Sequence, residues 1–357
     1  MGMAVNRRQW GLWCVSSLMA TPTGGVFAQG TASSTASPGL AGGRRVEIAV
    51  VEKSAFCVLP LTVAERLRFF AAEGLDVQIR DFPDATAAVQ TVLQGRAQVL
   101  SASFGTAALL QARGVMPMTS FLLQGRTPQL VLGLSTQAHP ESDPLRNVRG
   151  LRVGVAGLHT GAHRVARLVL RKAGVSPALV QYVPLRQHDA AIRAFRTGQI
   201  DAICHTDPTI TLLEQEGGLK VLADTRTVRG NAEVFGGPLP AACLAASATT
   251  LDKQPELFQA ISHAMVRALK WLQTAGPSDV IRVVPEAYFM GDRALYLSAF
   301  ARAREAWTPD GMMPEDGPGT LLKAVSSLGE MPELQEVDLA RTYTNRFALK
   351  AKARFRA

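Results

Sequence analysis

Residues 46–51, with the sequence VEIAVV, and residues 151–156, with the sequence LRVGVA, decide the fold because each begins the same series of elements. Both are short apolar runs of the kind that forms a buried strand. After each run the pattern predicts a helix (60–72 and 159–173), a strand (75–80 and 179–183), a helix (84–94 and 188–197) and a strand (96–100 and 199–203). Strands that alternate with helices indicate a parallel sheet. The sequence therefore predicts an α/β protein with two similar, Rossmann-like lobes.

The segments between and after the two copies predict a hinge. A strand at residues 130–134 follows the first copy, and residues 240–246 form another apolar strand after the second. If that later strand returns to the first lobe, the chain crosses between the lobes twice, and the cleft between them can close on a ligand. The predicted boundaries are 44–136 and 240–357 for the first lobe, 145–232 for the second lobe, and 137–144 and 233–239 for the crossings.

The first 28 residues have the pattern of an export signal peptide. Arg7 and Arg8 precede an apolar stretch that is too short to span a bilayer, and the sequence VFA at 26–28 suits cleavage. The signal resembles either a twin-arginine signal or a general secretory one. Residues 29–43 are rich in small residues and predict a flexible leader. We therefore expect a periplasmic protein.

Charge and cysteine content exclude several classes of function. The net charge is +9, but the basic residues are spread along the chain, so we expect no nucleic-acid partner. The mature chain keeps Cys57, Cys204 and Cys243, which are far apart in sequence and favour buried thiols. No CxxC motif or His/Cys cluster points to a metal, and we expect no cofactor.

Several segments together resemble the nitrate/sulfonate/taurine-type substrate-binding proteins of ABC importers. They are FFAAEGLDV at 69–77, QGRAQV at 94–99, GQIDAI at 198–203, TDPTI at 206–210, ADTR at 223–226 and FGGPLP at 235–240. The resemblance covers nearly all of the mature chain. It implies a type II periplasmic-binding-protein fold, a small anionic ligand (a sulfonate, nitrate, taurine or a related compound) between the lobes, and a monomer that partners a permease and its ATPase. The chain departs from the family at Gln98, where an Asp is more usual.

The predicted ligand site lies where strands end and helices begin. In open α/β sheets ligands bind beyond the carboxyl ends of the strands, and helix N-termini attract anions. The hydroxyl groups among the candidates could equally serve as N-caps, and Asp207 could cap a helix or select an amine on the ligand. The candidate ligand-binding residues are Lys53, Ser54, Ser101, Ser103, Thr106, Arg126, His159, Thr160, Gly161 and Asp207.

Two enzymatic alternatives use the same fold. Some desulfinases place a nucleophilic cysteine after the first strand, which here would be Cys57, with help from Arg126 and from one of His159, His163 or His205. A reactive thiol needs a lowered pKa, whereas Cys57 lies in an apolar run typical of a packed thiol. A thiamine-precursor pyrimidine synthase would require a cysteine-rich motif that the sequence lacks. We therefore predict a binding protein without catalytic activity.

Overall fold

The computed structural model describes residues 43–137 and 150–357. The predicted signal peptide, nearly all of the predicted leader and most of the predicted crossing at 137–144 lie outside these residues. In the described part of the chain, no helix is both long enough and apolar enough to cross a membrane.

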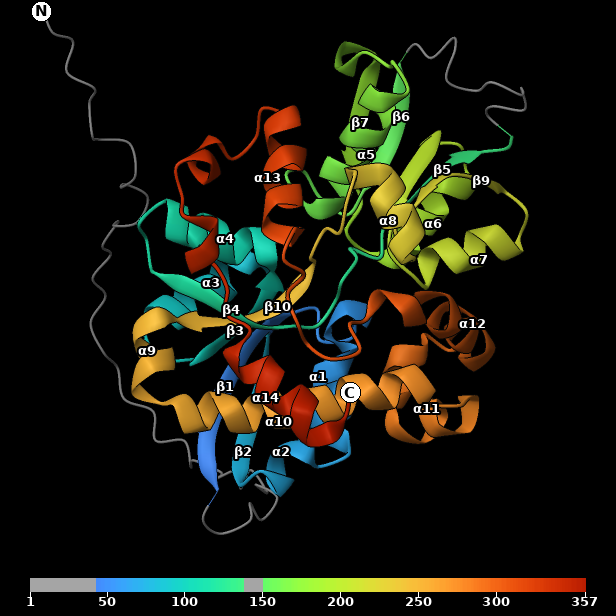
Figure 1. Ribbon diagram of the computed structural model, residues 1–357. Helices are drawn as coiled ribbons and strands as arrows, with labels where there is room; N and C mark the ends of the chain where they lie inside the picture. The colour runs from blue at the N-terminus through green and yellow to red at the C-terminus, as the bar shows by residue number, and fades with distance from the viewer. Residues whose placement is uncertain (1–42, 138–149) are drawn as a thin grey trace, which may run out of the picture. The chain divides into compact units, whose positions relative to one another are not determined.

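Two five-stranded sheets of identical topology form the framework (Figure 1). The first has the order β2-β1-β3-β10-β4 and the second the order β7-β6-β8-β5-β9. In each sheet the first three strands are parallel, and the fourth, β10 or β5, runs antiparallel to its neighbours. The strands are β1 (Arg44–Val51), β2 (Leu75–Phe82), β3 (Val99–Ser103), β4 (Met118–Leu123), β5 (Val131–Ser135), β6 (Leu151–Val155), β7 (Val180–Pro184), β8 (Ala202–His205), β9 (Leu219–Asp224) and β10 (Ala242–Ser247). The prediction of two similar α/β lobes is confirmed.

The first crossing lies earlier in the chain than the sequence suggested. The sequence predicts β5 in a first lobe that ends at residue 136, but the strand pairs with β8 and β9 in the second sheet. The chain therefore leaves the first lobe after β4, through residues 124–130. The apolar sequence of β5 suits the interior of either sheet, so only its pairing reveals its lobe. The return of residues 240–246 to the first sheet, as β10, is confirmed.

Equivalent residues of the two copies make the same contact. The side chain of Gln98 accepts a hydrogen bond from the backbone N–H of Glu47 in β1 at 2.8 Å. Asp201, at the matching place before β8, accepts one from the backbone N–H of Arg152 in β6 at 2.9 Å. The amide oxygen of Gln98 thus replaces a carboxylate oxygen without loss of this bond, which explains how the chain tolerates its departure from the family pattern.

The first lobe has an apolar core on each face of its sheet. Val46, Ile48 and Val50 of β1 point into the larger core, whereas Ala49 points into the other, as strand alternation requires. Helices α10 and α14 pack side by side near the C-terminus (Figure 1).

The helices before the first crossing are η1 (Phe56–Val58), α1 (Leu59–Arg66), α2 (Phe69–Ala72), α3 (Ala85–Leu93) and α4 (Phe104–Ala112). Those after β10 are α9 (Ala248–Lys253), α10 (Pro255–Thr274), α11 (Pro277–Val283), η3 (Glu286–Phe289), α12 (Arg293–Ala303), η4 (Arg304–Ala306), α13 (Gly317–Ser327), η5 (Pro332–Gln335), η6 (Leu339–Arg341) and α14 (Arg346–Phe355).

The second lobe follows the same plan, with one core on each side of its sheet. Two helices of the C-terminal region also contact it: α12 packs on α7, and α13 packs on α5 and α8. Polar side chains reinforce the α12 contact, because Arg302 donates to Glu214 at 2.9 Å. The helices of the second lobe are α5 (Gly161–Lys172), η2 (Pro177–Leu179), α6 (His188–Arg196), α7 (Thr209–Gln215) and α8 (Val228–Phe235).

Gly230 in α8 occupies a position that no other residue fits. A Cβ atom there would lie 1.8 Å from the carbonyl oxygen of Asp224, which is backbone and cannot rotate away. We predict that Gly230→Ala lowers the free energy of unfolding by about 3 kcal/mol in a urea titration, because overpacking forces the backbone to move. Gly319→Ala is the matched control, since a Cβ at this helical glycine meets nothing within 4 Å. Equal stability of the two variants would contradict the packing described for α8.

Candidate functional site

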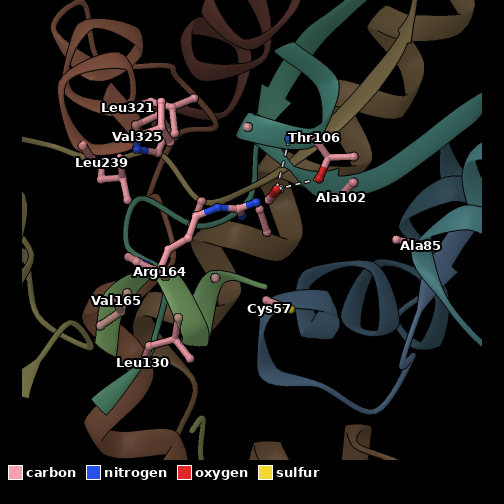
Figure 2. Close-up of a pocket in the computed structure, with 18 of the residues that line it drawn as sticks. Cys57, Ala85, Ala102, Thr106, Leu130, Arg164, Val165, Leu239, Leu321 and Val325 are labelled. Atoms are coloured by element: carbon pink, nitrogen blue, oxygen red, sulfur yellow. Dashed lines mark hydrogen bonds between the residues drawn. The ribbon is translucent and has the colours of Figure 1, made fainter. Parts of the chain in front are cut away.

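A cavity of about 350 Å³ is lined by residues from both lobes. Its walls are formed by the β3–α4 junction, the first two turns of α5, both crossing segments and one face of α13. Most of the lining side chains are apolar, including Leu130, Val165, Leu239, Leu321 and Val325 (Figure 2). This volume and lining suit a small molecule with a hydrocarbon portion.

Hydroxyl groups and two helix N-termini make part of the cavity wall polar. Ser103 is the N-cap of α4: its Oγ accepts from the backbone N–H of Thr106 at 3.2 Å and lies 2.9 Å from Thr106 Oγ1. Ser101, at the end of β3, accepts from Gln124 Nε2 at 3.0 Å. Gly105 in α4 and Gly161 in α5 also line the cavity. The first N–H groups of a helix lack intrahelical partners, so this part of the wall favours negative charge.

Arg164 is the charged residue that lines this cavity. Its side chain, about a quarter exposed, extends into the cavity toward Thr106 (Figure 2). Its Nε donates to Glu330 Oε2 at 2.7 Å, and Arg167 pairs with the other oxygen of the same carboxylate. Two guanidinium groups and one carboxylate leave a net positive charge beside an otherwise apolar space, an arrangement that suits an organic anion.

A second, more polar cavity of about 700 Å³ lies at the ends of β1, β7 and β8. Ser54 and Asp207 line it, together with Glu52 and His188. His188 bridges the lobes, because its Nε2 lies 3.4 Å from Glu52 Oε1 while its Nδ1 lies 2.6 Å from Thr209 Oγ1. Burial alone would raise the pKa of Glu52, but the hydrogen bond and charge of His188 hold that pKa below its usual value.

His205 is buried at the end of β8, with its ring edge-on to that of His188 at a centroid distance of 5.0 Å. Burial, with a smaller contribution from the charge on His188, lowers the pKa of His205 to about 4. The imidazole is therefore neutral at pH 7. It does not provide a positive charge for an anionic ligand.

The buried His205 predicts a loss of stability in acid. As the pH falls from 6.5, the ordinary pKa of histidine, towards about 4, His205 becomes protonated in the unfolded chain but stays neutral in the folded protein. His205→Phe removes this difference. Between pH 7 and pH 4.5 the free energy of unfolding of the variant, measured by urea titration, should therefore fall by about 2 kcal/mol less than that of the wild type. If both proteins lose the same stability over this range, His205 is not buried in its neutral form.

Asp207 is held by the second lobe rather than presented freely to a ligand. Its Oδ1 accepts from the backbone N–H of Thr211 at 2.9 Å and from Thr211 Oγ1 at 2.8 Å. Its Oδ2 lies 3.3 Å from Nη1 of the buried Arg226, which also pairs with Glu214 and Asp224. This network explains the buried carboxylate as a structural feature of the α7 start.

The predicted site residues fall into three groups. Ser101, Ser103, Thr106 and Gly161 come together in the first cavity, and Ser54 and Asp207 line the second. The remaining four, Lys53, Arg126, His159 and Thr160, line neither cavity.

These four residues instead make hydrogen bonds or ion pairs with other parts of the protein. Lys53 pairs with Glu65 at 2.9 Å, and Arg126 Nε donates to the carbonyl oxygen of Glu305 at 2.8 Å. Thr160 is the N-cap of α5 and donates to the carbonyl oxygen of Gly157 at 2.6 Å. His159, at a positive φ of 61°, donates its backbone N–H to His163 Nδ1 at 3.0 Å.

Arg164 was missed from the sequence, although one signal marks it. It lies in the first turn of α5, which contains no acidic residue. A cation there faces the positive end of the helix dipole, which is unfavourable unless an anion compensates. Glu330 provides that anion from a distant part of the chain, and no sequence pattern connects the two residues.

Cys57 lines the first cavity, but burial raises the pKa of its thiol to about 12, with a further contribution from the charge on Glu52. Cys204 and Cys243 are buried, and the three cysteines of the described residues are free thiols. Within residues 43–137 and 150–357, no group of three or more His, Cys, Asp or Glu side chains could hold a metal ion.

The raised pKa of Cys57 predicts a slow reaction with alkylating agents, because the thiolate is the nucleophilic form. In the folded protein at pH 7.5, iodoacetamide should modify Cys57 at least about 100-fold more slowly than a cysteine in an unfolded peptide. Peptide mass spectrometry after timed quenching measures this rate, and the urea-unfolded chain is the control. Rapid and complete modification of Cys57 in the folded protein would instead favour a reactive thiol.

Comparisons with known proteins agree with this architecture. The model of the family described as NMT1/THI5 like matches residues 55–277. YtlA of Bacillus subtilis (strain 168), named as a candidate binding protein, is 21% identical over 300 residues, which cover 81% of this chain and 85% of YtlA.

Solved structures that share the fold include the following three. A protein from Bordetella bronchiseptica RB50 is 38% identical, with a TM-score of 0.77, covering 88% of this chain and 98% of its own. The aliphatic sulphonate binding protein SsuA from Escherichia coli is 15% identical (TM-score 0.64; 84% and 91% covered). The nitrate-binding protein NrtA from Synechocystis PCC 6803 is 12% identical (TM-score 0.63; 87% and 89% covered).

Proposed function

Because the chain belongs to the NMT1/THI5-like family, we propose that it is a periplasmic solute-binding protein that captures a small organic anion between its lobes. The captured anion is delivered to the permease and ATPase of an ABC importer, and the binding protein acts as a monomer. The observation that carries this proposal is the first cavity: an apolar space beside the side chain of Arg164 and the N-termini of α4 and α5.

The wall chemistry favours an alkyl sulfonate or a related organic acid over nitrate. Nitrate carries no apolar surface, so the apolar side chains of α13 and of the crossings would only desolvate it. An alkyl chain, by contrast, gains about 0.8 kcal/mol for each methylene group that it buries. The negative head group would meet Arg164, Ser103 and Thr106, and the alkyl chain would lie against Leu130 and Leu239.

The site supports binding without catalysis. Cys57 is the nucleophilic side chain that an enzyme of this fold would use, and its raised pKa keeps it protonated at neutral pH. Two of the structural relatives, SsuA from Escherichia coli and NrtA from Synechocystis PCC 6803, are named for binding sulphonate and nitrate.

A homologous series of ligands tests the proposal. For ethane-, butane- and hexanesulfonate, the Kd measured by isothermal titration calorimetry should fall about fourfold for each added methylene until the chain fills the cavity. Arg164→Gln should weaken hexanesulfonate binding about thirtyfold, because it removes a charge-assisted contact. Arg229→Gln is the control, since Arg229 is exposed on α8 and lines neither cavity.

Two results would count against this function. If nitrate or taurine binds more tightly than hexanesulfonate, the cavity does not select for an apolar body. If no sulfonate, alkyl carboxylate, taurine or nitrate binds at all, the capture of an organic anion is wrong.

A further inference from the structure

The first cavity and the contact between α5 and α13 share a residue, Arg164. Its guanidinium group has five N–H donors in one plane. Nε–H is used by Glu330, and within the described part of the chain the structure shows no other hydrogen bond from the Arg164 side chain. One edge of the guanidinium is therefore held by protein, while the side chain extends into the cavity (Figure 2).

Glu330 is itself firmly placed. Its side chain is only 14% exposed, and its two oxygens are divided between Arg164 and Arg167. It follows α13, which is anchored in the first lobe because Leu321 and Val325 belong to a core of that lobe. The Glu330 carboxylate is thus held in place by the first lobe and binds two arginines of the second lobe.

The same surface of α5 holds the C-terminal end of α13. Arg167 Nη2 donates to the carbonyl oxygen of Leu328 at 3.3 Å, and Arg171 donates to that of Ser327. Cations at the negative end of a helix are favourable. Arg167 and Arg171 therefore both hold the end of α13 beside α5, and Arg171 keeps its contact with Ser327 when Arg167 is replaced.

We propose that Glu330 is a positioning residue for the ligand: it holds one edge of the Arg164 guanidinium so that the other edge faces the anion in the cavity. This inference rests on the proposed function, and it adds a residue that lies outside the cavity wall. A long arginine side chain loses considerable rotational freedom when it is fixed. Because Glu330 already restricts the Arg164 side chain before the ligand binds, less conformational entropy is lost on binding, and the affinity is higher.

A double-mutant cycle tests whether Glu330 acts through Arg164. The probe is octanesulfonate, whose long chain keeps binding measurable when Arg164 is replaced. Glu330→Gln should weaken binding about tenfold in the wild-type background but less than about twofold in the Arg164→Gln background. Glu333→Gln is the matched control, because Glu333 pairs with Arg113 at 3.0 Å, away from Arg164, and should leave the Kd unchanged.

The Arg167→Gln variant distinguishes the positioning of Arg164 by Glu330 from a general role of Glu330 in holding the two lobes together. It removes the second partner of Glu330 and the bond to Leu328 but keeps the Arg164–Glu330 pair, so it should change the Kd less than about threefold. Unfolding temperatures without ligand check that each variant is folded; if Glu330→Gln does not fold, Glu330→Asp takes its place in the cycle.

Three results would overturn the proposal. The first is an unchanged Kd for Glu330→Gln. The second is an equal loss of affinity when Glu330→Gln is made in the wild type and in Arg164→Gln. The third is an Arg167→Gln variant that binds octanesulfonate as weakly as Glu330→Gln does. In each of these cases the wild type still binds octanesulfonate and the proposed function stands. A wild type that binds none of the sulfonates would overturn both.

Discussion

The exchange of one strand between the lobes is the constraint on which the rest of the structure depends. Strand β5 follows β4 of the first lobe, yet it pairs between β8 and β9 of the second. Strand β10 follows α8 of the second lobe, yet it inserts between β3 and β4 of the first. Each sheet is complete only when the chain has passed between the lobes, so the two crossings are obligatory. Residues of both crossings, Leu130 and Leu239 among them, then form part of the cavity wall.

The chemistry of the cavity follows from what surrounds these crossings. The starts of α4 and α5 bring hydroxyl groups and the positive ends of two helix dipoles to one part of its wall, while α13 covers another part with leucine and valine. Arg164 adds positive charge, and Glu330 balances part of it from the other lobe. In a low-dielectric site an uncompensated cation would be costly, whereas a cation with one carboxylate partner is tolerated and still attracts an anion.

The second cavity and the buried network behind it have a different character. Asp207, the buried Arg226 and its other carboxylate partners are satisfied within the protein, and Arg302 extends this network to α12. Glu52 and His188 add a polar contact between the lobes. All of these side chains have partners within the protein, and the Arg302–Glu214 and His188–Glu52 contacts link the lobes. Arg164, by contrast, is the charged side chain that lines the more apolar cavity.

By itself the sequence determined the duplicated strand–helix series, the parallel pairing of the first three strands in each sheet and the return of residues 240–246, because periodicity and glycine stops are local properties. It also located the β3–α4 junction and the α5 start, where Ser103 and Gly161 line the cavity. Only the tertiary structure decided the lobe of β5, since an apolar strand fits the interior of either sheet. Likewise, only folding showed that Lys53 is paired with Glu65, and that Arg164 meets Glu330 more than 150 residues away. A partner as distant along the chain as Glu330 is chosen by packing, which leaves no periodic trace in the sequence.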